Sequence, residues 1–130
     1  MKLTRAGEYA IRCILYLSRQ DVTDTIRRHD VAGHMDIPMQ FLSKIAQQLA
    51  KAGLIQITQG SKGGYRLIRS PEQITLLEVI EAVEGELVLN DCLLEHDRCS
   101  RKGTCAVHQV WAKARGQLRD TLAGVTFAEL

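Results

Sequence analysis

Apolar residues near the start of the chain recur at intervals of three and four, which is typical of an amphipathic helix. Thr4 is a suitable amino-terminal cap, and the pattern predicts a helix that runs to about Ser18. Its apolar face consists of Ala6, Tyr9, Ala10, Cys13, Ile14 and Leu17. Since Cys13 lies on this face, we interpret it as a small core side chain.

Two further helices are indicated before residue 53. A short one, over residues 28–35, turns Val31, Ala32 and Met35 inward. The turn "MDIP" follows, and Pro38 suits the first position of the next helix, which Gly53 ends. Its predicted buried face consists of Phe41, Leu42, Ile45, Ala46 and Leu49.

The period then changes to two. The stretches "LIQIT" and "YRLI" are typical of paired strands, and the intervening "QGSKGG" supplies the glycines that a tight hairpin tip needs. Three helices followed by a hairpin is the order of a winged helix-turn-helix. In that fold the third helix enters the major groove and the hairpin touches the flanking backbone.

Two helices are expected after the hairpin. Thr75 and Glu78 form a capping box for a helix through Val83 that Gly85 ends. A last helix, from Thr104, has an apolar seam that suits a coiled-coil partner, although packing against its own domain is an alternative. The seam consists of Val107, Trp111, Ala114, Leu118, Leu122 and Val125.

The expected fold is mainly α with a small β-hairpin wing: a winged helix-turn-helix DNA-binding domain plus a long carboxy-terminal dimerisation helix. We expect the DNA-binding region over residues 1–85, a cysteine-containing loop over 86–106, and the dimerisation helix and tail over 104–130. The chain has 130 residues, which suits one compact domain overall.

Charge is divided unevenly along the chain. Residues 1–70 hold eleven basic and five acidic side chains, whereas residues 71–130 hold six and ten. The first part therefore attracts a polyanion such as double-stranded DNA, and the second repels it. No secretion signal or membrane span is evident, so we expect a cytoplasmic protein without membrane contact.

The third helix has polar side chains that can reach base edges in the major groove. Gln40, Ser43, Lys44 and Gln47 offer amide, hydroxyl and ammonium donors on one face, although a plain solvated helix would show the same set. Lys62 and Arg66 in the hairpin suit phosphates. The complete set of expected DNA contacts is Pro38, Met39, Gln40, Ser43, Lys44, Gln47, Gln59, Ser61, Lys62, Tyr65 and Arg66.

Three of the four cysteines lie close together, in "DCLLEHDRCSRKGTCAVH". Cys92, Cys99 and Cys105 lack the short paired spacing of zinc fingers, and a loop of this kind fits an iron-sulfur cluster better. Zinc held by three cysteines and His108, or reactive thiols without metal, are the alternatives. Glu8 is another candidate ligand, which a two-fold dimer would carry to its neighbour's loop.

These stretches together resemble one family of bacterial winged-helix regulators. The resemblance is carried by "LTRAGEYAIRCILYLS", "IPMQFLSKIAQQLAKAGLI", "GSKGGYRL", "ITLLEVIEAVEG" and the three-cysteine loop. The family includes the iron-sulfur regulator IscR, the nitric-oxide sensor NsrR and the cysteine-metabolism regulator CymR. The match covers nearly the whole chain.

The resemblance implies a homodimeric transcription factor, of the branch that binds an iron-sulfur cluster. Cys92, Cys99 and Cys105 match the family's cluster cysteines, and either His108 or Glu8 of the partner subunit would be the fourth ligand. The cluster would be 2Fe-2S or 4Fe-4S accordingly. The spacing from Cys92 to Cys99 is one residue longer than in IscR-like loops. Gln59 and the pair Ser61-Lys62 stand where an arginine and a proline-glycine pair are common.

We therefore expect a DNA-binding repressor that senses iron-sulfur, redox or nitric-oxide status. The alternatives are a zinc-stabilised or thiol-based regulator, or an interaction module that binds no DNA. No nucleotide-binding glycine motif and no nucleophile with a base partner is present, so an enzyme is not expected.

Overall fold

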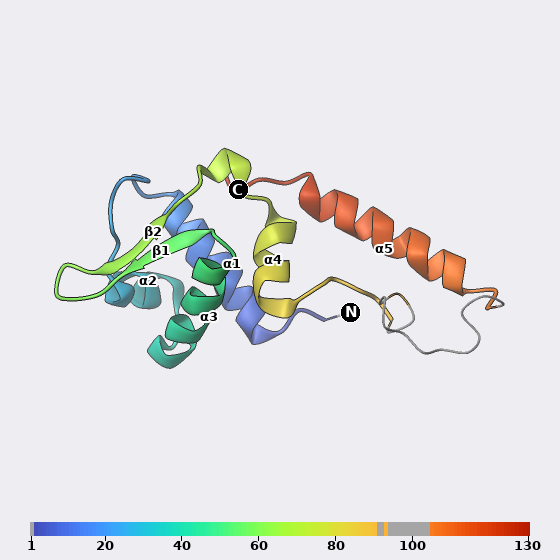
Figure 1. The fold of residues 1–130 in the computed structure, drawn as a ribbon, viewed down its shortest axis with the longest axis horizontal. Helices are drawn as coiled ribbons and strands as arrows, with labels where there is room; N and C mark the ends of the chain where they lie inside the picture. Colours follow the sequence, from blue (N-terminus) through green and yellow to red (C-terminus); the bar gives the residue numbers. More distant parts are fainter. Residues whose placement is uncertain (1, 91–92, 94–104) are drawn as a thin grey trace.

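The computed structural model describes residues 2–90, 93 and 105–130. The helices α1, α2 and α3 precede the hairpin of β1 and β2, a short 3₁₀ turn η1 leads into α4, and α5 comes last (Figure 1). The bounds are α1 Arg5–Ser18, α2 Arg28–Met35, α3 Met39–Lys51, β1 Ile55–Thr58, β2 Gly64–Leu67, η1 Pro71–Gln73, α4 Leu76–Glu84 and α5 His108–Ala123.

The core lies between α1, α3 and α4 and is closed by the inner face of the hairpin. Ile14, Leu42, Ile45 and Ile74 are among its fully buried side chains. Cys13 is buried as the sequence predicts, and burial raises the pKa of its thiol to about 12. A thiol that stays protonated in this way is a packing group and not a nucleophile.

The hairpin is antiparallel, with a register that runs from Ile55 opposite Leu67 to Thr58 opposite Gly64. The chain before α2 pairs with it as well, because Ile26 and Tyr65 exchange two backbone hydrogen bonds of 2.8 Å. Gly64 makes this possible: a Cβ there would lie 2.0 Å from the Ile26 carbonyl oxygen. The wing is thereby fixed to the start of α2.

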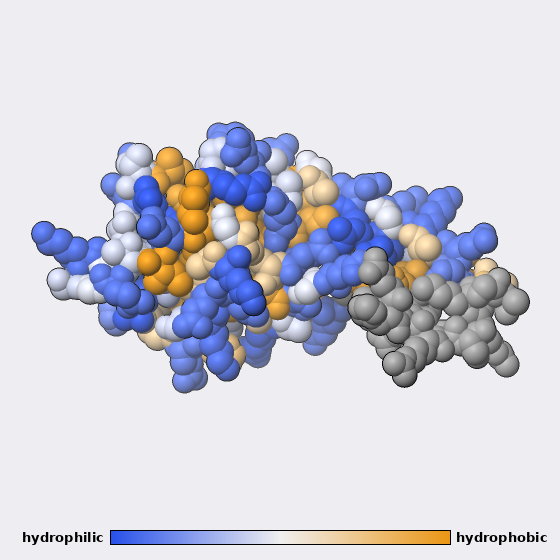
Figure 2. All heavy atoms as spheres, in the orientation of Figure 1, coloured by the Kyte–Doolittle hydropathy of each residue, from blue (hydrophilic) through white to orange (hydrophobic). Residues whose placement is uncertain are grey.

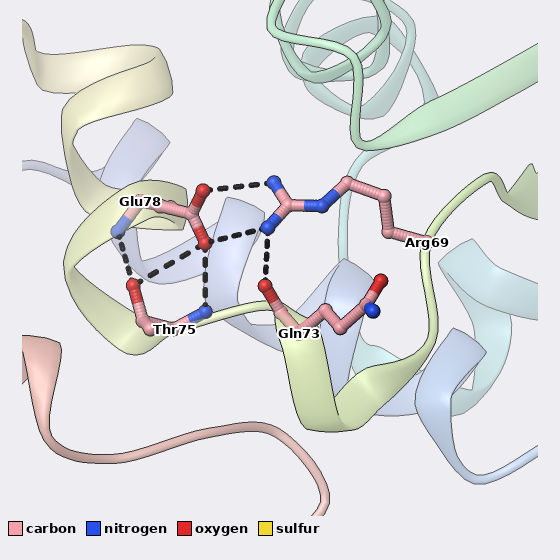
Figure 3. A network of polar contacts seen from close by, with 4 residues as sticks. All are labelled: Arg69, Gln73, Thr75 and Glu78. Atoms are coloured by element: carbon pink, nitrogen blue, oxygen red, sulfur yellow. Dashed lines mark hydrogen bonds and ion pairs between the residues drawn. The ribbon is translucent and has the colours of Figure 1, made fainter.

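A polar network joins the end of the hairpin to the start of α4 (Figure 3). Arg69 Nη1 pairs with Glu78 Oε1 at 2.8 Å, and Arg69 Nη2 donates to the Gln73 carbonyl oxygen. Thr75 and Glu78 form the predicted capping box, with 3.2 Å from the Glu78 amide to Thr75 Oγ1. The segment between wing and α4 is thus held at both ends.

The helix α5 extends from this body on the side away from the hairpin (Figure 1). None of its residues is buried. After it the chain returns to the core, where Thr126 pairs with Thr75 and the Phe127 ring is buried. Sequence patterns do not predict this return, because two residues in a short tail carry no periodicity.

Most of the predicted elements are confirmed, including all three helices before the hairpin and the paired strands. Three details of the predicted element boundaries are wrong. Pro38 is the N-cap residue of α3 and not its first helical residue. The last helix begins at His108, so Cys105 precedes it, and Val125 lies beyond its end. Among the described residues, no helix is both long and apolar enough to span a membrane.

Candidate functional site

The helix α3 presents a continuous polar face on the side opposite its buried residues. Gln40, Lys44 and Gln47 are exposed, and Ser43 lies half-buried at the edge beside the hairpin. Pro38 and Met39 form the beginning of the helix, where Pro38 is exposed and Met39 half-buried. The side chains chosen from the sequence as base readers therefore share one accessible surface.

Phe41 is the exception to the predicted buried face of α3, since its side chain is 41% exposed. Its ring contacts Tyr9 of α1 with ring centroids 5.7 Å apart, and it lines a hollow with Gln40 and Lys44. The four buried residues of α3 leave Phe41 at the margin of the apolar stripe, so periodicity alone misplaced it. An apolar ring at this position can contact a thymine methyl group.

The hairpin tip is polar and accessible. Gln59, Ser61 and Lys62 are exposed, and the view in Figure 2 shows the tip as hydrophilic. Arg66 lies half-buried on β2, where its Nη2 donates to Gln56 Oε1 at 2.6 Å. Tyr65 differs from the other expected contacts because it is only 1% exposed. Its ring belongs to the core between the wing and α3.

The expected metal site is described only in part. Cys92 and Cys99 lie outside the described residues. Cys105 is half-buried just before α5, and the His108 amide donates to the Cys105 carbonyl oxygen at 3.2 Å. His108 Nδ1 is buried and has no hydrogen-bond partner among the described residues. Within that part of the chain, no group of three or more His, Cys, Asp or Glu side chains could hold a metal ion.

Glu8, the other expected fourth ligand, is exposed in the first turn of α1. It lines an open hollow together with Lys2, Leu3, Thr4 and Arg5. No residue in the described part of the chain covers Glu8, so its carboxylate is accessible there.

The expected dimer residues of α5 fall into two groups. Val107 and Trp111 are exposed near its beginning, and Ala114 is half-buried. Leu118 and Leu122 instead pack against the body, on Leu77, Ile80 and Leu87. Val125 follows the helix, and its carbonyl oxygen accepts from the Leu76 amide at 2.9 Å.

Three comparisons place the chain among known proteins. The Rrf2 family, described as "Iron-dependent Transcriptional regulator", matches residues 3–130. The chain is 31% identical over 131 residues to the regulator NsrR of Geobacillus kaustophilus, and the match covers 100% of this chain and 89% of that protein. It is 29% identical over 130 residues to IscR of Vibrio campbellii, with 100% of this chain and 77% of that protein covered.

A solved structure with a similar fold supports the same family relationship. The oxidized form of Staphylococcus aureus CymR superposes with a TM-score of 0.74 at 26% identity, over 99% of this chain and 94% of that one. Three helices, a wing and an accessible polar face on the third helix define a winged-helix DNA-binding protein. The chain belongs to the Rrf2 family. It is a DNA-binding transcriptional regulator and not an enzyme.

Proposed function

We propose that this regulator is a cytoplasmic homodimer, and a repressor, that senses iron-sulfur, redox or nitric-oxide status through a bound iron-sulfur cluster. Residues 1–85 bind DNA, residues 86–106 form the cluster loop, and residues 104–130 form the dimerisation helix and tail. Cys92, Cys99 and Cys105 hold the cluster, with His108 or Glu8 of the partner subunit as the fourth ligand. The observation that carries this proposal is that Cys105 lies one turn before His108, whose buried Nδ1 has no hydrogen-bond partner among the described residues.

The two described candidate ligands from the end of the loop, Cys105 and His108, are of the thiol and imidazole types that hold iron-sulfur clusters. A buried imidazole nitrogen without a partner is costly, because desolvation is not repaid by a hydrogen bond. Within residues 2–90, 93 and 105–130, His108 Nδ1 is buried without such a partner, and Cys105 belongs to the same turn. A bound iron-sulfur cluster would supply a centre that oxidation or nitric oxide alters. His108 and Cys105 would connect that centre directly to the first turn of α5.

The homodimer is supported by the exposed beginning of α5. Val107, Val110 and Trp111 are all large apolar side chains that the monomer leaves exposed. The Asn90 side-chain amide is oriented so that its nitrogen donates to the Leu89 carbonyl oxygen and its oxygen accepts from Trp111 Nε1 at 3.1 Å. This hydrogen bond holds the indole in one position. An ordered aromatic side chain with an exposed ring suits the centre of an interface. A second copy of the chain is the occupant we propose.

Contacts within the chain connect α5 to the DNA-binding surface. Arg119 of α5 pairs with Glu81 of α4 at 2.6 Å, and the opposite end of α4 is tied to the hairpin through Glu78 and Arg69. We propose that a change at the cluster reaches the wing along this chain of contacts. A coupling of about 1–3 kcal/mol would suffice for a several-fold to hundredfold change in operator affinity.

Anaerobic purification tests the cofactor. We expect a coloured protein with iron and acid-labile sulfide, and loss of both in Cys105→Ala but not in Cys13→Ala, which removes a buried thiol outside the loop. Operator affinity should then differ between the cluster-bound and cluster-free protein. A colourless protein with one zinc per chain would instead support the zinc-stabilised alternative, and equal operator affinity in both states would exclude sensing through the cluster.

We propose that α3 reads bases through Gln40, Ser43, Lys44 and Gln47, with Pro38 and Met39 beside them. The wing residues Gln59, Ser61, Lys62 and Arg66 contact the flanking DNA, whereas the buried Tyr65 ring supports the wing from the core. Lys44→Ala should relax the preference at one operator position by about 1–3 kcal/mol. Lys62→Ala should weaken binding to all duplexes alike and lower the salt slope by about one. A uniform loss with Lys44→Ala would place Lys44 on the DNA backbone instead.

A further inference from the structure

A narrow cleft of about 70 Å³ separates α3 from the hairpin. Six of its seven lining residues carry a hydrogen-bond donor in the side chain, and none carries a carboxylate. Such a lining suits an anion with several acceptor oxygens. The donors belong to Arg28, Ser43, Gln47, Thr58, Gln59 and Tyr65.

Arg28 supplies the positive charge of this cleft, and the backbone fixes its position. It is the first residue of α2, two positions after Ile26, which is hydrogen-bonded to Tyr65 of the wing. Burial raises the pKa of the Tyr65 hydroxyl, and the nearby Arg28 guanidinium acts in the opposite direction. The backbone at Arg28 is therefore fixed relative to the wing.

The Arg28 guanidinium has no ion pair or hydrogen bond to another side chain in the described part of the chain, where the ion pairs involve Arg69, Arg115 and Arg119. A guanidinium prefers bidentate contact with a carboxylate or a phosphate. Since the cleft offers no carboxylate and the protein binds DNA, a phosphate is the anion that fits.

The location of the cleft indicates which part of the DNA would supply this phosphate. When α3 lies in the major groove and the hairpin touches the flanking DNA, one DNA strand must pass between them. The cleft opens between these two elements, with Ser43 and Gln47 on the α3 side and Thr58 and Gln59 on the hairpin side.

We propose that this cleft receives one backbone phosphate of the operator in each protomer and that Arg28 is its principal ligand. Gln59 donates from the hairpin wall. The inference rests on DNA binding, but it does not depend on the iron-sulfur cluster. It adds a DNA contact from α2 to those expected from α3 and the wing.

The test uses a duplex enriched from a random pool by the full-length wild-type protein. Its affinity for Arg28→Ala, Arg28→Lys and the control Lys113→Ala is measured by fluorescence anisotropy over a range of salt concentrations. Lys113 is exposed on α5 and gives the same loss of charge. Arg28→Ala should bind roughly tenfold more weakly, as expected for loss of a charged hydrogen bond, and its salt slope should fall by about one. Arg28→Lys should keep the slope while losing part of the affinity.

Neutral methylphosphonate groups, placed at one phosphate at a time, locate the contact. One position near each recognition helix should weaken the wild type but have no additional effect on Arg28→Ala. If Arg28→Ala behaves like Lys113→Ala, or changes base preference instead of overall affinity, the inference is overturned while DNA binding stands. If the wild type enriches no duplex, both fail.

Discussion

The winged-helix body and α5 are stabilised in different ways. Helices α1, α3 and α4 and the hairpin bury an apolar core in which many side chains are completely inaccessible. The helix α5 buries no residue, and it is attached by Leu118 and Leu122 and by the arginines Arg115 and Arg119. Apolar burial is the larger source of stability, and partly exposed ion pairs contribute less.

Under the proposed function, the two regions have different partners. The body is a complete fold whose accessible surface is available to DNA. The attachment of α5 leaves Val107, Val110 and Trp111 exposed at the end that carries Cys105 and His108. An element that is held loosely by its own chain can respond to a second subunit and to a bound group, because few internal contacts oppose its movement.

The largest expected effect is on the free energy of unfolding when a leucine of the body is truncated. Leu42→Ala should lower it by about 2–5 kcal/mol, because Leu42 is fully buried and its loss leaves a cavity. The matched change in α5, Leu118→Ala, should cost only about 1 kcal/mol since Leu118 is half-buried. Urea unfolding measures both. Equal losses would mean that α5 is packed as tightly as the body.

The next effect is on self-association. Trp111→Ala should raise the dimer dissociation constant about 30-fold or more, as truncation of a central aromatic residue does, with little change in monomer stability. Analytical ultracentrifugation measures the constant, and Lys113→Ala is the control. Trp111 is the chain's single tryptophan, so dilution of the wild type should also shift its fluorescence to longer wavelength. A wild-type emission independent of concentration, with unchanged association of the variant, would place the interface elsewhere.

The smallest effect concerns the link between α4 and α5. Burial by itself would raise the pKa of Glu81, but hydrogen bonds from Arg119 and from the Leu87 amide outweigh it, and the pKa lies below its ordinary value of 4.5. The Glu81 contribution to stability is therefore complete well above pH 4.5 and is lost as the pH falls through the lowered pKa. At neutral pH, Glu81→Gln or Arg119→Ala should reduce the free energy of unfolding by about 1 kcal/mol.

Unfolding measured from pH 7 down to pH 3 checks this expectation. The difference between the wild type and Glu81→Gln should shrink as the medium becomes more acidic. Glu72→Gln, which changes an exposed carboxylate in η1, is the control and should differ little from the wild type at any pH. A difference between the wild type and Glu81→Gln that is constant with pH would show that the pair contributes through packing and not through charge.

Local patterns were sufficient for the helices, the hairpin and the α4 cap, because each depends on residues three or four apart or on glycine at a turn. The same patterns were insufficient for Phe41, which lies at the edge of an apolar stripe where only the neighbouring Tyr9 decides the exposure. They also missed Arg28, since a basic residue at the start of a short helix has no distinctive spacing.

By itself, the sequence determined the order of the elements, the winged-helix class, the identity of Cys13 as a core residue and the polar face of α3. Only the tertiary structure decided which half of the α5 seam packs on its own body, how the tail returns to α4, and that Arg28 and Gln59 line one cleft. The physical reason is the distance along the chain over which each kind of interaction acts. Periodicity and capping act within a few residues, whereas burial and the pairing of charges depend on chain segments that only folding brings together.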